Sequence, residues 1–296
     1  MAATVRTLTA ICRNPMAAVF KRMMGSATPR RTAIVTGSSR GIGKAIAQRL
    51  AADGYAVTVN DVALNKQGID TLVSDINKSY GAGSAIGVVA DVSSSSELHS
   101  MVEESVSKLG PLTVMVANAG IAQVATVLET TDADVDRIMN VNFKGVWNCY
   151  TSAAKQMIAQ GPVPEGSTGY KILGCSSIAA FKPFPLLATY CASKWAVRGL
   201  THTFAMELAK HGISVNCYAP GIVGTAMWEE IDEKLGAIDG RAKGETLNKY
   251  VKELTAMGRV SVPEDVAKVV AGFLCGPNSM FVTGQTVVVD GGIVFT

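Results

Sequence analysis

A glycine-rich turn near the start of the chain restricts the fold more than any other feature of the sequence. The run Ala33–Thr36 has the β-branched, apolar composition of a buried strand, and the segment from Ile42 to Leu50 places apolar side chains on one helical face. Between them lies the run Gly37-Ser38-Ser39-Arg40-Gly41-Ile42-Gly43. A strand, a glycine triad and a helix in this order predict a nucleotide-binding α/β unit.

Six further apolar, β-rich runs alternate with helix-length segments along the chain. This alternation predicts a parallel sheet covered by helices on both faces. We expect a single α/β domain over residues 31–296, with a Rossmann-type, doubly wound, seven-stranded parallel sheet. The charged and glycine-rich stretch at about 225–252 is the expected substrate flap. The expected strands are Ala33–Thr36, Ala56–Asn60, Ala85–Ala90, Leu112–Ala117, Tyr170–Gly174, Ile213–Tyr218 and Thr286–Val289.

The first thirty residues have five basic side chains and no acidic one, because the first acid is Asp53. Methionine, valine and phenylalanine side chains in this stretch fall on one helical face. This pattern fits two interpretations of residues 1–30 equally, a mitochondrial targeting leader or a disordered tail with a chance stripe. The protein is accordingly expected in the cytoplasm or the mitochondrion. The five basic residues are Arg6, Arg13, Lys21, Arg22 and Arg30.

The rest of the chain is nearly neutral. Without those five, 22 of the 27 basic side chains remain against 24 acidic ones. Such a balance offers no basic surface to nucleic acid, and no apolar run reaches the ~20 residues that span a membrane. The six cysteines and three histidines form no ligand pattern, so no metal is expected. We therefore expect a small molecule as the partner.

The glycine-rich turn has the features of a dinucleotide site. Gly37 permits a tight turn, Gly41 lets the backbone approach a pyrophosphate, and Gly43 allows close packing of helix on strand. Asp61 ends the second strand, where a carboxylate accepts ribose hydroxyls and repels a 2′-phosphate, which favours NAD(H). A strand-end cap is the other interpretation of Asp61. Arg40 could pair with a 2′-phosphate, so NADP(H) remains an alternative.

A tyrosine with a lysine four residues later is the candidate catalytic pair. The spacing places Tyr190 and Lys194 on one helical face, where the ammonium group lowers the tyrosine pKa from ~10 and lets the phenol act as general acid or base. By itself the pair could be a chance match. Ser177, just past the fifth expected strand, could hold a substrate carbonyl oxygen. Ser176 competes for this role, and a turn-forming serine is the alternative.

These motifs, in this order, make the chain resemble the short-chain dehydrogenase/reductase family over about Thr32–Thr296. The resemblance implies an enzyme that transfers a hydride between a nicotinamide cofactor and a secondary alcohol or ketone. It also implies a homotetramer. The matching motifs are the glycine turn, Asp91-Val92, Asn118-Ala119-Gly120, Asn142 before Gly145, Ser177, Tyr190 with Lys194, and Pro220-Gly221.

The resemblance assigns roles to individual positions. Asn142 would hold a water that feeds protons to Lys194, which also binds the nicotinamide ribose, and this completes a Ser-Tyr-Lys-Asn catalytic set. Asp91 and Val92 would contact the adenine. Asn118 and Gly120 would steady the central strand, and Val223 and Thr225 would hold the carboxamide. The implied cofactor contacts are Gly37, Ser39, Arg40, Gly41, Ile42, Gly43, Asp61, Asp91, Val92, Asn118, Gly120, Tyr190, Lys194, Pro220, Gly221, Val223 and Thr225.

The run from Pro220 to Asp232 resembles acetoin (diacetyl) reductases, also called butanediol dehydrogenases, which implies a small acyclic ketone as substrate. Gly224 and Ala226 depart from the diol-type pattern. Ile178, Phe184 and Trp228 are the candidate substrate pocket, and the apolar character of Ile178 and Phe184 favours the alternative of a bulkier alicyclic or polyol substrate. A non-catalytic nucleotide-binding or structural subunit is the alternative of another class.

Overall fold

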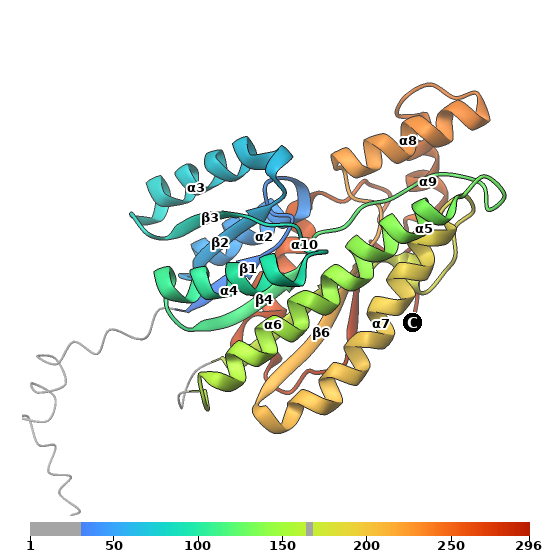
Figure 1. Ribbon diagram of the computed structural model, residues 1–296. Coiled ribbons are helices and arrows are strands. Elements are labelled where there is room, and N and C mark those ends of the chain that lie inside the picture. Colours follow the sequence, from blue (N-terminus) through green and yellow to red (C-terminus); the bar gives the residue numbers. More distant parts are fainter. Residues whose placement is uncertain (1–30, 164–167) are drawn as a thin grey trace, which may run out of the picture. The chain divides into compact units, whose positions relative to one another are not determined.

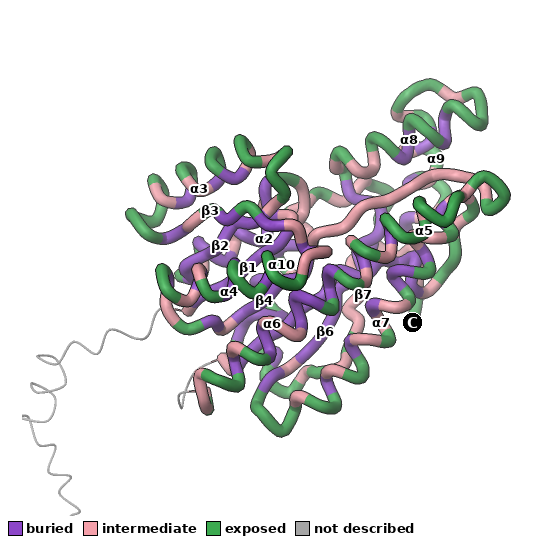
Figure 2. Tube along the Cα trace, viewed as in Figure 1, coloured by how far each residue is buried: buried purple, intermediate pink, exposed green. Residues whose placement is uncertain are grey.

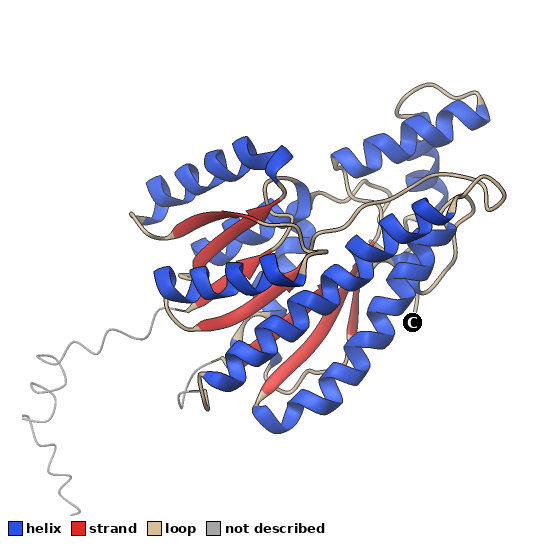
Figure 3. Ribbon diagram, in the orientation of Figure 1, coloured by secondary structure: helices blue, strands red, loops and turns tan. Residues whose placement is uncertain are grey.

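The computed structural model describes residues 31–163 and 168–296, so the predicted leader at 1–30 lies outside the described residues. Residues 31–296 form one compact unit around a seven-stranded sheet (Figure 3). Every neighbouring pair of strands is parallel, in the order β3-β2-β1-β4-β5-β6-β7. The strands are β1 (Thr32–Val35), β2 (Ala56–Asp61), β3 (Ala85–Val89), β4 (Leu112–Ala117), β5 (Tyr170–Cys175), β6 (Ile213–Pro220) and β7 (Thr286–Val289).

The predicted Rossmann-type sheet is confirmed, with two strands at their predicted bounds and five that differ by one or two residues. The largest difference is at the end of β6, which continues to Pro220. Proline has no N–H group, but the hydrogen bond from this end of β6 to β7 is made by the N–H of Gly221, which donates to Val289 O at 3.1 Å. The proline therefore leaves this bond intact. β2 similarly includes Asp61, which pairs with Val89.

Helices cover both faces of the sheet (Figure 1). α2, α3 and α10 pack on one face, and α4, α6 and α7 pack on the other. Alternate residues of β1 supply the two cores, since Ala33 and Val35 belong to the first and Ile34 to the second. The helices are α2 (Gly41–Ala52), α3 (Lys66–Tyr80), α4 (Ser95–Leu109), α5 (Asp132–Met139), α6 (Gly145–Ala159), α7 (Ala188–Leu208), α8 (Ala226–Asp239), α9 (Glu245–Leu254) and α10 (Pro263–Val269).

The burial pattern follows from this layering. The inner strands β1, β2, β4, β5 and β6 are buried along most of their length, whereas the edge strands β3 and β7 are partly exposed and the helices alternate buried and exposed positions (Figure 2). None of the helices in the described part of the chain has the length and apolar character needed to cross a membrane.

The segment predicted as the flap contains a pair of helices, α8 and α9. We call residues 226–254 the lid. Gly240 follows the last residue of α8 with φ of 69°, and Gly244 precedes the first residue of α9 with φ of 89°. Both glycines therefore mark helix ends and do not interrupt a helix. Gly236 lies within α8, where an added Cβ would be 3.0 Å from Arg241 O. In Figure 1 the lid projects beyond the carboxyl ends of the strands.

Candidate active site

A cavity of about 970 Å³ opens at the carboxyl ends of the strands. It starts at the turn after β1 and continues past β4 and β5 to the lid. The strand order reverses between β1 and β4, and such a reversal is where doubly wound folds bind their ligands. All the residues predicted to form the site line this cavity except Ser39 and Asn142, which lie directly behind its wall.

The start of α2 offers backbone N–H groups to an anion. Arg40 is the N-cap residue, and its exposed side chain makes no cap hydrogen bond, so the amides of the first turn face the cavity without a side-chain acceptor. Gly37 and Gly41 have φ of 61° and 56°, a conformation that other residues rarely adopt. A Cβ on Gly37 would lie 2.8 Å from Ala119 Cα. The turn therefore fits a pyrophosphate bound close to the backbone.

Asp61 is held by three residues at the end of β2. Its Oδ2 accepts hydrogen bonds from the hydroxyl and the N–H of Ser39, at 2.5 and 3.4 Å. Its Oδ1 accepts from the N–H of Val62 and from Asn65 Nδ2, both at 2.9 Å. A carboxylate has about four acceptor positions. Ribose hydroxyls therefore have to compete with Ser39 or Asn65, while the negative charge stays fixed in place.

Asn118 connects three strands beside the cavity. Its Nδ2 donates to Thr36 O and Gly37 O, both at 3.0 Å, and its Oδ1 accepts from the Tyr218 hydroxyl at 2.9 Å. The turn after β1 is thereby fixed to the ends of β4 and β6.

Asp91 lies just after the end of β3 and lines the cavity. Its carboxylate accepts hydrogen bonds from the N–H and the hydroxyl of Ser93, at 2.9 and 2.8 Å.

Tyr190 and Lys194 lie one turn apart on α7, as their spacing predicts. Lys194 is 2% exposed, and its Nζ lies 5.4 Å from the centre of the Tyr190 ring. The ammonium group donates to Cys175 O at 2.9 Å, at the end of β5. A Cβ on Gly120 would lie 3.3 Å from Lys194 Nζ, so glycine leaves the space this ammonium needs.

Of the two candidate serines, Ser177 is the one whose hydroxyl contacts Tyr190. Its Oγ also accepts from the N–H of Ala179 at 3.1 Å. The Ser176 hydroxyl instead donates to the backbone oxygen of Lys194 at 3.2 Å, so it connects β5 to α7. Arg198 holds the segment after Ser177, because its guanidinium lies 4.1 Å from the Phe181 ring centre and donates to Ala180 O at 3.3 Å.

Asn142 lies in a π-helical turn, η2 (Asn140–Lys144), between α5 and α6. Such turns occur often at functional sites. Its Oδ1 accepts from the N–H of Ile121 at 2.9 Å, and its Nδ2 donates to Ile121 O at 2.9 Å and to Ser193 Oγ at 3.0 Å. Ser193 donates in turn to Tyr190 O at 2.7 Å. Asn142 thus connects the loop after β4 to the helix that carries Tyr190.

The pKa of Tyr190 is raised, not lowered as its spacing from Lys194 suggests. Burial of the phenol is the largest cause and raises the pKa, whereas the Lys194 ammonium and the hydrogen bond with Ser177 lower it. The sequence reveals the lysine but not that the burial of the phenol, whose side chain is partly exposed to the cavity, outweighs it. The phenol is therefore protonated near neutral pH, the form that can donate a proton.

The outer part of the cavity is mostly apolar. The predicted residues Ile178, Phe184 and Trp228 all line it. Four lid residues that sequence reasoning did not single out line it too, namely Ile231 and Leu235 of α8 and Tyr250 and Leu254 of α9. Each pair has a spacing of four residues on its helix, which is the signal that could have revealed them.

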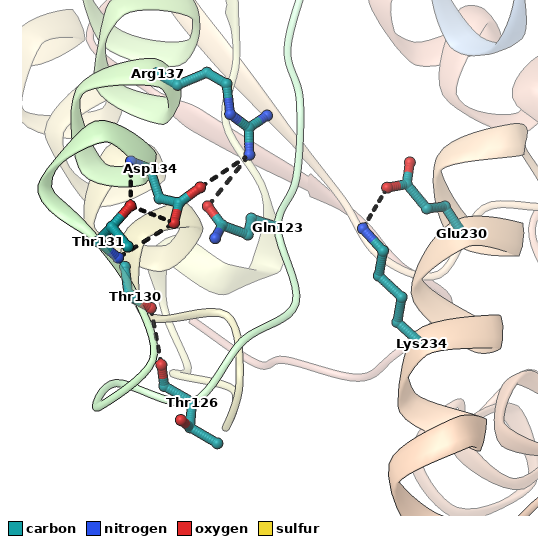
Figure 4. Close-up of polar contacts among 8 residues, drawn as sticks. All are labelled: Gln123, Thr126, Thr130, Thr131, Asp134, Arg137, Glu230 and Lys234. Carbon is teal, nitrogen blue, oxygen red and sulfur yellow. Dashed lines mark hydrogen bonds and ion pairs between the residues drawn. The ribbon is translucent and has the colours of Figure 1, made fainter.

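Charged side chains of two elements, α5 and α8, line the cavity, and Figure 4 shows their polar contacts. On α5, Arg137 pairs with Asp134 at 3.6 Å and donates to Gln123 Oε1 at 3.3 Å. On α8, Lys234 pairs with Glu230 at 2.6 Å. Arg137 and Glu230 both line the cavity, but each is already paired on its own side.

Comparisons with known proteins agree with this site. A family model described as short chain dehydrogenase matches residues 31–236. L-2,3-butanediol dehydrogenase of Corynebacterium glutamicum is 41% identical over 265 residues, covering 90% of this chain and 99% of that protein. An (S)-acetoin-forming diacetyl reductase of Staphylococcus epidermidis is 37% identical over 268 residues, with 90% and 99% covered.

Among solved structures, a blue fluorescent protein from a metagenomic library, in complex with NADPH, matches with a TM-score of 0.76. The two sequences are 31% identical, and the match covers 90% of this chain and 98% of the other. The resemblance inferred from the motifs is thus confirmed. The chain belongs to the short-chain dehydrogenase family and is a nicotinamide-dependent oxidoreductase of secondary alcohols and ketones.

Proposed function

We propose that this enzyme uses NAD(H) to reduce a small acyclic diketone or hydroxyketone, such as diacetyl or acetoin, and to oxidise the corresponding alcohol. One observation carries the proposal: Ser177, Tyr190 and Lys194 converge on the same cavity that begins at the N-terminus of α2. The relatives named butanediol dehydrogenase and diacetyl reductase support the choice of substrate.

The chemistry that a nicotinamide supplies when bound is hydride transfer. We assign the proton to the Tyr190 hydroxyl, which would donate it to the substrate carbonyl oxygen. The Ser177 hydroxyl would hold the same oxygen by a hydrogen bond. Lys194 would stabilise the phenolate that remains, and its buried ammonium is held in position by Cys175 O. Asn142 supports the arrangement through Ile121 and Ser193.

The remaining predicted contacts would hold the dinucleotide along the cavity, which all of them except Ser39 line. We assign the pyrophosphate to the first turn of α2, the adenine to Asp91 and Val92, and the carboxamide of the nicotinamide to Val223 and Thr225. Thr225 donates to Val223 O at 3.3 Å, which supports the shape of this segment.

The preference for NAD(H) is part of the proposal and depends on charge. Ser39, Val62 and Asn65 hold the Asp61 carboxylate at the end of β2, so a 2′-phosphate would approach a fixed negative charge. Arg40 is exposed and forms no ion pair with this carboxylate in the described chain, which leaves NADP(H) as the alternative. The solved relative with NADPH keeps that alternative open to test.

A bulkier ketone is the second candidate, favoured by the apolar lining. Ile178, Phe184, Trp228 and the lid residues offer few polar groups to a second substrate oxygen. A buried oxygen without a partner costs about 1–3 kcal/mol, which would disfavour a small dicarbonyl relative to an apolar ketone.

Initial rates of NADH and NADPH oxidation, measured on the purified protein with a panel of ketones, test the proposal. The panel contains diacetyl, acetoin, a cyclic ketone and a bulky aliphatic ketone. Fast NADH turnover of diacetyl or acetoin supports the proposal. Turnover of the bulky ketones alone keeps the mechanism and selects the second candidate. Absence of turnover with every ketone contradicts both.

We also propose that the protein is a homotetramer. Trp147 on α6 and Trp195 on α7 are 44% and 48% exposed, and Met206 on α7 is 83% exposed, so these two helices present apolar surface. Analytical ultracentrifugation should give four times the monomer mass of 30.9 kDa. A monomer at micromolar concentration would contradict the proposal.

Residues 1–30 are proposed to direct the protein to mitochondria. The basis is the five basic and no acidic side chains of this segment. Fusion of the segment to a fluorescent reporter should place the reporter in mitochondria, and a diffuse cytoplasmic signal would contradict the assignment.

A further inference from the structure

Helix α9 begins without a side chain of its own to cap it. Its N-cap residue is Gly244, with φ of 89° and no side-chain acceptor, so the N–H groups of its first turn need acceptors from elsewhere. Asp232, in the middle of α8, supplies them. Its Oδ2 accepts from the N–H of Gly244, and its Oδ1 accepts from the N–H of Leu247 at 2.7 Å. A capping box makes these two bonds within one helix, and here they join two helices.

The burial of Asp232 makes this arrangement hard to replace. The residue is 2% exposed, and none of the ion pairs in the described chain includes it. Its negative charge is therefore stabilised by the amides and by the N-terminal end of α9. Removal of the carboxylate leaves two N–H groups without their acceptor. One side chain thus fixes how α9 is placed on α8.

The placement of these helices determines the outer wall of the cavity. Ile231 and Leu235 flank Asp232 on α8 and line the cavity, and Tyr250 and Leu254 line it from α9. Asp232 itself is not part of the lining, and neither is the N-terminus of α9. A change in the connection between the helices therefore alters the pocket wall, whereas the dinucleotide end and the Tyr190 end keep their own contacts.

We propose that Asp232 is a positioning residue for substrate specificity, which holds α9 against α8 so that the lid residues form one ketone-binding wall. It acts through the side chains of both helices and touches neither the cofactor nor the reacting atoms. The inference rests on the proposed function, since the wall selects a ketone only if this cavity reduces one.

The test compares Asp232→Ala with the isosteric Asp232→Asn, which keeps one of the two acceptor oxygens. Glu233→Ala is the matched control, because Glu233 is the exposed neighbour on the same helix. In Asp232→Ala the KM for whichever ketone of the panel the parent reduces most efficiently should rise roughly 3- to 30-fold, the range expected for loss of a helix cap. The change in kcat should be smaller, the Kd of NADH should stay the same, and Asp232→Asn should lie between the parent and Asp232→Ala.

Hydrogen exchange gives a readout that needs no turnover. The amides of Gly244 and Leu247 should exchange faster in Asp232→Ala, while the amides of β4 keep their protection. Unchanged exchange at these two amides would overturn the inference, as would a fall in kcat with no change in KM, or an equal loss of NADH affinity. If the parent reduces no ketone, the proposed function fails, and the exchange rates still decide separately whether Asp232 holds α9.

Discussion

The floor of the cavity and its lid hold their side chains by different means. On the floor, Tyr190 and Lys194 share one helix, and bonds from β5, from η2 and from the loop after β4 fix the surrounding groups. Arg198 adds a contact that holds the segment after Ser177. The floor therefore keeps its geometry through several independent contacts.

The lid is held at its base and by contacts between its two helices. Its base is joined to the rest of the domain by a short parallel bridge between Val223 and Ser261, with Gly224 N–H donating to Ser261 O at 2.9 Å. Within the lid, Asp232 connects the two helices. We therefore assign proton transfer to the residues of the floor and substrate selection to the residues of the lid.

Tyr190→Phe should have the largest effect. It removes the hydroxyl assigned to proton transfer, and kcat should fall by about 10²- to 10⁴-fold. NADH affinity should remain near that of the parent, because the pyrophosphate and adenine ends are untouched. Steady-state kinetics and a fluorescence titration with NADH measure the two quantities. Tyr80→Phe, an exposed tyrosine on α3, is the matched control. A parent-like kcat in Tyr190→Phe would remove Tyr190 from the mechanism.

Lys194→Ala should reduce turnover at pH 7 by roughly 100-fold. Burial raises the Tyr190 pKa and Lys194 lowers it, so loss of the ammonium raises the pKa further. Alcohol oxidation needs the phenolate, and its rate should therefore rise only at higher pH than in the parent. The pH dependence of kcat/KM measures this shift, with Lys194→Arg as the variant that keeps the charge. A midpoint equal to the parent's would contradict the role of Lys194.

Asp61→Ala tests the nucleotide end of the floor. Removal of the fixed charge should raise the ratio of NADPH to NADH efficiency by roughly tenfold, because a 2′-phosphate no longer meets a carboxylate. Asp61→Asn keeps the shape of the side chain and should give a similar change. The measurement is kcat/KM for both nucleotides at one ketone concentration. An unchanged ratio would refute the assignment of NAD(H) preference to Asp61.

Trp228→Ala should have the smallest effect on turnover and the clearest effect on selection. Trp228 lines the outer cavity from α8, so its removal should leave kcat for diacetyl within about threefold of the parent and enlarge the pocket for bulky ketones. The ratio of kcat/KM for bulky and small ketones is the quantity to measure. If Ser177→Ala shifts this ratio as much as Trp228→Ala does, the division between floor and lid is wrong.

The floor was largely predictable because its signals are local. The spacing of Tyr190 and Lys194, and the glycines of the turn after β1, are determined by a single helix and a single turn. Asn142 was found through the family resemblance alone, since its contacts with Ile121 and Ser193 depend on the tertiary fold. The direction of the Tyr190 pKa shift was mispredicted because burial depends on the whole domain.

The lid was predictable only as an insertion. Its charge and glycine content indicated a flexible flap, but Gly240 and Gly244 turned out to be helix ends. The capping of α9 by a side chain of α8 cannot be seen in the sequence, because Asp232 is twelve residues from Gly244 and fifteen from Leu247. Contacts between helices, rather than patterns within one helix, determine this wall.

An isotope label tests directly whether the nicotinamide supplies the hydride and Tyr190 the proton. Diacetyl is reduced with NADH that carries deuterium at both hydrogen positions of the nicotinamide C4, and the product is analysed by mass spectrometry and NMR. We expect the parent enzyme to produce acetoin with one deuterium on its carbinol carbon, and Tyr190→Phe to produce almost no labelled acetoin. Acetoin without deuterium, or equal labelled product from the parent and Tyr190→Phe, would contradict this expectation.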